Sequence, residues 1–177
     1  MRYSLLSITS KNAITIIKVV GVLMVTSEEL MARFSDLTYK FEPNMPEKQK
    51  GLYINNVVYL NPQQHPRELT STVAEEIGHH LTSVGDIIDQ DTNEKRKQEQ
   101  KARDIGATMV VTPQDLIDCY HERFTYVWEC ADFLGITKQA LECALSAYSK
   151  QFPEGLVYGD YKLFFKPNGT LGIVEWF

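Results

Sequence analysis

The sequence predicts an α+β fold with a helical core, a small antiparallel sheet and a β-hairpin at the C-terminus. Short alternating segments occur between residues 37 and 60 and again after residue 155, whereas helical periodicity dominates from residue 66 to residue 150. A hydrophobic content of 44% and a charged content of 23% are typical of a globular protein. The 177 residues suit one compact domain, or a domain with a small appendage.

Residues 1–25 form an apolar N-terminal extension whose character stays open between three alternatives. Its β-branched content fits a strand or a hydrophobic tail packed on the body, and a third alternative is an upstream extension of a gene that usually starts at Met24. A membrane anchor is the least favoured interpretation. The apolar run from residue 13 to residue 25 is shorter than the ~20 residues that a bilayer requires, and Lys18 lies near its middle.

The segment from residue 26 to residue 60 predicts one helix followed by three strands. Hydroxyl side chains at residues 26–27 can cap a helix whose first turn carries two glutamates. Residues 37–41 alternate as a strand does. Residues 51–54 and 57–60 form a hairpin around Asn55-Asn56, because asparagine tolerates the positive φ of a tight turn.

Three helices follow. Pro66 is placed to begin the first, which runs to about Ser83, because a proline at this position loses no hydrogen bond. The second opens in the highly charged stretch of residues 91–101. The third begins at Pro113 and runs to about Phe124.

Residues 126–150 predict a helix pair around Gly135, with Ala131 and Leu141 at the spacing of a helix-turn-helix. A DNA-reading pair needs a basic second helix, which is lacking here, so a structural or protein-docking role is favoured. The net charge of −5 and the pI of about 5.4 also argue against direct nucleic-acid binding. The predicted division is 26–118 for the main domain, 119–152 for the helix pair and 153–177 for the C-terminal hairpin.

The chemistry is concentrated in residues 72–81, within the helix that Pro66 begins. Glu75 and His79 lie one turn apart, with Glu76 beside them, on the side turned away from the apolar face. Such a pair can share a metal ion while the neighbouring carboxylate reaches a bound water, as in the His-Glu-x-x-His helix, although Glu75 replaces the first histidine. The plain alternative is an ordinary polar helix surface. The apolar face consists of Leu69, Val73, Ile77, Leu81 and Val84.

Two features favour the metal interpretation over the plain one. Gly78 inside a helix costs roughly 1 kcal/mol relative to Ala, which suggests close approach of another element. The second helix carries Glu99 near the small residues Ala102 and Gly106, so it can pack closely on the first and bring in a third ligand.

These residues carry a resemblance to a known family. Ala74-Glu75-Glu76-Ile77-Gly78-His79-His80, the segment Lys97–Ala102 and Val110-Val111-Thr112-Pro113 resemble the ImmA/IrrE metallo-endopeptidases of phages and mobile elements. The resemblance covers about residues 26–148. It implies a zincin-like fold and cleavage of a helix-turn-helix repressor, with the strand at residues 57–60 as the sheet edge that receives the substrate.

The resemblance also implies roles for single residues. Glu76 matches the general base, His79 and Glu99 match metal ligands, and Glu75 stands at the position of the first ligand. Zinc is the expected metal, with Mn²⁺ or Fe²⁺ as alternatives because two carboxylates favour harder ions. His80 is expected to be a partly buried, satisfied histidine that supports the ligands, with metal ligation as the less favoured alternative.

Asp86 either supports His79 or caps the following turn. The three cysteines, Cys119, Cys130 and Cys143, predict buried small side chains in a reducing compartment. The resemblance implies that this compartment is the cytoplasm of a bacterial host. A catalytically inactive relative that binds a repressor or host protein is the alternative function. A DNA-associated or structural module is the third.

Overall fold

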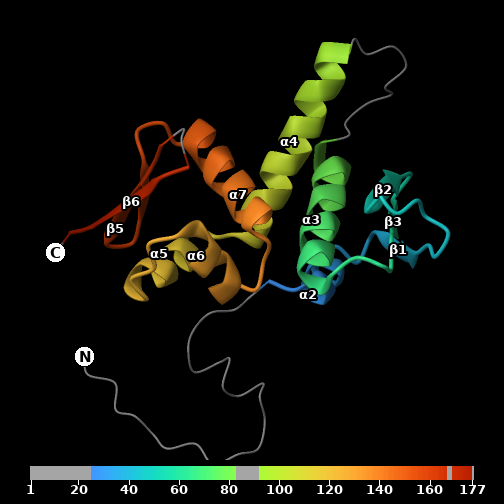
Figure 1. The fold of residues 1–177 in the computed structure, drawn as a ribbon. Helices are drawn as coiled ribbons and strands as arrows, with labels where there is room; N and C mark the ends of the chain where they lie inside the picture. The colour runs from blue at the N-terminus through green and yellow to red at the C-terminus, as the bar shows by residue number, and fades with distance from the viewer. Residues whose placement is uncertain (1–24, 83–91, 167–168, 177) are drawn as a thin grey trace, which may run out of the picture.

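The computed structural model describes residues 25–82, 92–166 and 169–176. Helices α3 and α4 lie side by side at the centre, one small sheet flanks α3, and helix α7 with a second sheet lies beyond α4 (Figure 1). The elements in chain order are α2 (Ser27–Arg33), β1 (Thr38–Phe41), β2 (Gly51–Ile54), β3 (Val57–Leu60), α3 (Pro66–Thr82), α4 (Thr92–Val110), α5 (Pro113–His121), α6 (Val127–Phe133), α7 (Lys138–Gln151), β4 (Leu156–Tyr158), β5 (Tyr161–Phe165) and β6 (Leu171–Glu175).

The local signals before residue 66 are confirmed. Thr26 caps α2, and its hydroxyl oxygen accepts a hydrogen bond from the Glu29 amide while the Glu29 carboxylate accepts one from the Thr26 amide. Asn55 and Asn56 have φ angles of 47° and 62°, and this left-handed pair closes the β2–β3 hairpin.

The order of strands in the first sheet, β1-β3-β2, corrects one prediction. The strand at residues 57–60 is central and not at the edge, because β1 pairs with it in parallel while β2 pairs with it antiparallel. Its Val58 and Leu60 are fully buried. The strand at the sheet edge beside α3 is therefore β2. The predicted antiparallel hairpin of β2 and β3 is present, and β1 adds to it as a parallel third strand.

Helices α3 and α4 approach each other closely through small residues, as Gly78 suggests. A Cβ atom at Gly78 would overlap the main-chain carbonyl of Ala102, and one at Gly106 would lie 2.7 Å from the Ala74 carbonyl oxygen. Val73 and Ile77 on the core side of α3 are fully buried.

The apolar face of α3 ends earlier than predicted. Leu81 is 45% exposed, because burial along α3 stops at Gly78 and the last turn lies past the core. Val84 and Asp86 lie outside the described residues, as do residues 1–24, which hold nearly all of the apolar N-terminal extension.

The helix pair is present as predicted. Helix α6 leads through Gly135, at a φ of 63°, into α7, and Ala131 and Leu141 are buried. The predicted C-terminal hairpin is present as β5–β6, and β4 extends it to a three-stranded antiparallel sheet. Tyr148 on α7 stacks on Phe165 with ring centroids 5.1 Å apart, which attaches this sheet to the helical core.

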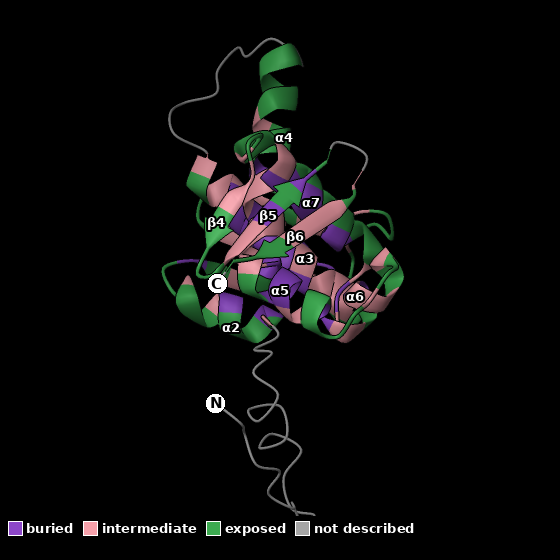
Figure 2. Ribbon diagram, turned by 90° about the vertical axis from the view of Figure 1, so that its left-hand side faces the viewer, coloured by how far each residue is buried: buried purple, intermediate pink, exposed green. Residues whose placement is uncertain are grey.

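Burial of the cysteines matches the prediction only in part. Cys119 is buried and Cys130 is half-buried, but Cys143, on α7, is exposed. Figure 2 shows that the first turns of α4 are also exposed. Among the described residues, no helix combines the length and apolar character that crossing a bilayer requires.

We expect Gly78→Ala to lower the free energy of unfolding by about 1–3 kcal/mol, since the added methyl group meets rigid backbone on α4. Overpacking here outweighs the ~1 kcal/mol by which Ala favours a helix. Urea denaturation measures the change. The control Ser146→Ala, at an exposed helical position, should be neutral or slightly stabilising; equal effects of the two substitutions would contradict close packing.

Candidate metal centre

The packing of α4 on α3 brings Glu75, His79 and Glu99 into one group. One ligand atom from each residue lies within 4.8 Å of the other two. His79 Nε2 is 3.6 Å from Glu99 Oε2, although the two residues come from different helices. The three residues predicted as metal ligands are thus neighbours in space.

The donor set suits a divalent transition metal. An imidazole and two carboxylates are accepted zinc ligands, and three protein ligands leave a position open. Ligand atoms around a tetrahedral zinc at bond lengths of ~2.0–2.1 Å are about 3.4 Å apart. The His79–Glu99 separation is close to this spacing, and all three ligand atoms already lie within 4.8 Å of one another, so a small rotation of the carboxylates brings them to it. The residues therefore fit a zinc ion.

Glu76 is the buried carboxylate of this helix. It is only 8% exposed, on the side of α3 that faces Gly51 and Tyr53 of β2. Burial raises its pKa to about 7, and the negative charges of Glu75 and Glu99 act in the same direction, while a hydrogen bond from the Tyr53 main-chain N–H opposes them. Glu76 is therefore poised to exchange a proton near neutral pH.

The outer backbone edge of β2, which pairs with no strand among the described residues, faces this carboxylate. Asn61 N–H donates to the Lys50 carbonyl at 2.9 Å, and Leu52 pairs with Tyr59, so the main-chain groups of Gly51 and Tyr53 alternate with these and point away from β3. The Tyr53 N–H that reaches Glu76 agrees with this alternation. A second extended chain could add to this edge of the sheet.

His80 is satisfied by partners away from the three-residue group. Its Nδ1 lies 3.0 Å from the Tyr53 hydroxyl, and its Nε2 lies 3.5 Å from an oxygen of Asp36. This arrangement matches the expected partly buried histidine that lies next to the ligands on the helix. The other predicted supporting residue, Asp86, lies outside the described residues.

Two residues at the site were not found by sequence reasoning. Arg103 donates from Nε to Glu75 Oε1 at 2.9 Å, and Tyr53 contacts both Glu76 and His80. Arg103 follows Glu99 by one helical turn, so the spacing could have indicated it. Nothing local indicated Tyr53, because its position depends on which strand lies at the edge.

A groove of about 450 Å³ extends along α3 from Glu75, the member of the three-residue group that lines it. Glu68, Thr72 and Glu75 lie along the α3 side, while Arg103 on α4 and the first turns of α7 line the opposite side. Lys50 pairs with Glu68 at 3.5 Å at the far end. The buried hydroxyl of Ser71, which also lines the groove, has no hydrogen-bond partner among the described residues, so the groove offers an unsatisfied polar group.

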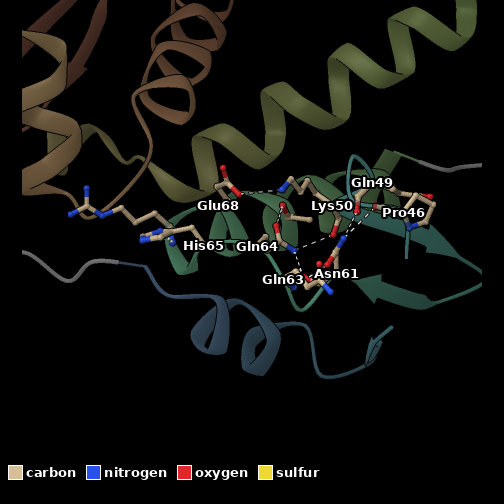
Figure 3. A network of polar contacts seen from close by, with 10 residues as sticks. Pro46, Gln49, Lys50, Asn61, Gln63, Gln64, His65 and Glu68 are labelled. Carbon is tan, nitrogen blue, oxygen red and sulfur yellow. Dashed lines mark hydrogen bonds and ion pairs between the residues drawn. The ribbon is translucent and has the colours of Figure 1, made fainter. Parts of the chain in front are cut away.

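A network of side-chain amides fixes the start of β2 against α3 (Figure 3). Gln64 donates to the Lys50 carbonyl at 3.1 Å and to the Asn61 carbonyl at 2.9 Å, and it accepts from the Thr72 hydroxyl at 2.7 Å. These contacts fix the position of Lys50, which lines the end of the groove, and they hold Gly51 beside Glu76.

Comparison with known proteins agrees with this geometry. Residues 27–146 match the family described as Peptidase_M78, IrrE N-terminal-like domain. The chain belongs to this family, which makes it metallopeptidase-like with a zincin-like α+β fold. No curated protein matches the chain.

A solved structure of a Mycobacterium tuberculosis transcriptional regulator is similar, with a TM-score of 0.54 and 11% sequence identity. The similarity covers 76% of this chain and 45% of the regulator. This chain thus spans less than half of that regulator, and at this identity the similarity shows the fold alone.

We expect Gln64→Leu to lower the free energy of unfolding by about 1–3 kcal/mol, because it removes the buried partner of the Thr72 hydroxyl and one of the two donors to the Lys50 carbonyl. Chemical denaturation measures the loss. Gln63→Leu is the matched control, since the Gln63 side chain is exposed. If the two variants were equally stable, the network would not contribute.

We expect the metal-free protein to lose stability relative to Glu76→Gln as the pH rises from about 4.5 to about 7. The folded state binds the Glu76 proton more tightly than the unfolded chain does. The protonated carboxyl group therefore contributes its full stabilisation of the fold below pH 4.5, and this contribution is lost as the pH rises through the folded pKa. Denaturation with a chelator present, at a series of pH values, measures this difference. Glu154→Gln removes an exposed carboxylate and controls for net charge. A constant difference between wild type and Glu76→Gln would contradict the raised pKa.

Proposed function

We propose that this protein is a metal-dependent endopeptidase, encoded by a phage or prophage, that cleaves a helix-turn-helix transcriptional repressor in the cytoplasm of its bacterial host. Cleavage relieves silencing by the repressor. The convergence of Glu75, His79 and Glu99, with the buried carboxylate of Glu76 beside them, carries this proposal. The repressor as substrate follows from the resemblance of the motif to the ImmA/IrrE metallo-endopeptidases.

The three ligands would hold zinc, with Mn²⁺ or Fe²⁺ as alternatives for a site with two carboxylates. The ion, when bound, supplies Lewis acidity that polarises the scissile carbonyl and lowers the pKa of a water molecule. Because α3 and α4 each contribute ligands, binding also ties the two helices together.

Glu76 moves the proton in this reaction. Its carboxylate accepts a proton from the attacking water as the water oxygen bonds to the carbonyl carbon, and it returns a proton to the amine nitrogen as the C–N bond breaks. A pKa of about 7 lets the same group act as base and then as acid near neutral pH.

The substrate lies in the groove along α3 as an extended segment. The outer edge of β2, with the main-chain groups of Gly51 and the carbonyl of Tyr53, offers hydrogen bonds to a polypeptide that adds as a further strand. The groove continues past Arg103 toward Lys50, so residues on one side of the cleaved bond lie between α3 and the start of α7.

One observation favours the second candidate, an inactive relative that binds a repressor or another host protein. The ion pair with Arg103 satisfies the Glu75 carboxylate without any metal. Direct DNA binding is not favoured by the described part of α7, in which Lys138 pairs with Glu142 and Lys150 pairs with Asp104.

Incubation with the repressor encoded beside this gene tests the function. We expect the wild type with Zn²⁺ or Mn²⁺ to cut the repressor once or a few times, and Glu76→Gln to bind the metal stoichiometrically but to cleave at least about 10²-fold more slowly, since its amide cannot accept the proton. Gel electrophoresis and mass spectrometry follow the fragments, and metal analysis follows occupancy.

Glu99→Gln is the companion variant, and it should lose both the metal and cleavage, since it removes a charged ligand. A wild type that carries no metal and leaves the repressor intact, but forms a stable complex with it, would replace the peptidase by the binding protein.

A further inference from the structure

The ion pair between Glu75 and Arg103 lies where this chain departs from the His-Glu-x-x-His spelling. Arg103 Nε donates to Glu75 Oε1 at 2.9 Å, and Arg103 follows the ligand Glu99 by one turn of α4. An arginine is thus in contact with the one ligand whose residue type is unusual.

The charge of the donor set explains what an arginine can do there. Two histidines and one carboxylate carry one negative charge, whereas Glu75, His79 and Glu99 carry two. The guanidinium of Arg103 is permanently protonated, so the four side chains together carry one negative charge again. The pair therefore offsets the charge that the replacement of histidine by glutamate adds.

The geometry of the pair also limits how Glu75 can bind an ion. Oε1 accepts a charged hydrogen bond from Arg103, which makes it the weaker metal donor of the two, so Glu75 would bind an ion through its other oxygen. A carboxylate that binds through one oxygen keeps the coordination number low, which suits tetrahedral zinc, whereas one that binds through both oxygens suits larger ions with more ligands.

We propose that Arg103 is a positioning residue that makes Glu75 a one-oxygen, charge-compensated ligand and thereby keeps the site selective for zinc over manganese. The inference rests on the proposed metal site and adds a second group that determines which metal the site holds. Hydrogen-bond partners of metal ligands typically change metal affinity by 10–100-fold, so an effect of this size is expected.

Metal binding by the full-length chain tests the inference. Zinc and manganese dissociation constants are measured by competition with a chromophoric chelator for wild type, Arg103→Gln and Arg103→Lys. We expect Arg103→Gln to shift the ratio of zinc affinity to manganese affinity toward manganese by about tenfold or more. Arg103→Lys should restore part of this ratio, because a lysine can still donate to Glu75.

The visible spectrum of the cobalt-loaded protein gives a second readout that a merely structural role would not move. We expect intense d–d absorption from low-coordinate Co²⁺ in the wild type and weaker absorption in Arg103→Gln, because the released oxygen raises the coordination number. Lys101→Gln removes a charge from an exposed site two residues away, roughly 200° around α4, and should change neither the ratio nor the spectrum.

The same substitution in a Glu75→His background distinguishes the direct contact between Arg103 and Glu75 from the long-range effect of the Arg103 charge. In Glu75→His no carboxylate oxygen is left for Arg103 to hold, so Arg103→Gln should barely alter the metal ratio there. If Arg103→Gln changed the ratio of zinc to manganese affinity equally in both backgrounds, or not at all in the wild-type background, the role of Arg103 would be overturned. The proposed peptidase function would be unaffected. A wild type that binds neither metal would overturn the proposed function and this inference with it.

Discussion

The close contact between α3 and α4 is the constraint on which the site depends. Glycine at positions 78 and 106 lets each helix lie against the backbone of the other, and protein interiors at native density leave no slack for extra methyl groups there. This distance places the Glu99 carboxylate 3.6 Å from the His79 ring. A wider spacing between the helices would separate Glu99 on α4 from Glu75 and His79 on α3, and the three side chains could then not bind one ion.

The same helix is held on its other side by the sheet. The Gln64 network attaches the start of β2 to α3, so the strand covers Glu76 and its edge lies next to the groove. Burial by this strand, more than the charge of its acidic neighbours, raises the pKa of Glu76. A single strand thus both buries the Glu76 carboxylate and brings the edge of the sheet beside it.

Much of this architecture could be predicted from the sequence, because it rests on local chemistry. Pro66 begins α3, Asn55 and Asn56 adopt the positive φ of the hairpin, and Gly135 turns the helix pair, each for a reason contained in a few neighbouring residues. The spacing of Glu75, Glu76 and His79, together with a later acid on a helix of small residues, was enough to predict the group of three.

The amino-acid sequence alone therefore determined the elements and the identity of the candidate ligands, while the tertiary structure decided what surrounds them. Strand order is set by pairing between distant segments, so the central position of β3, and with it the edge role of β2 and Tyr53, could not be derived from alternation. The contact of Arg103 with Glu75 likewise exists only because two helices pack at one particular distance. Local propensity acts over a few residues, whereas these contacts join residues that only the folded chain brings together.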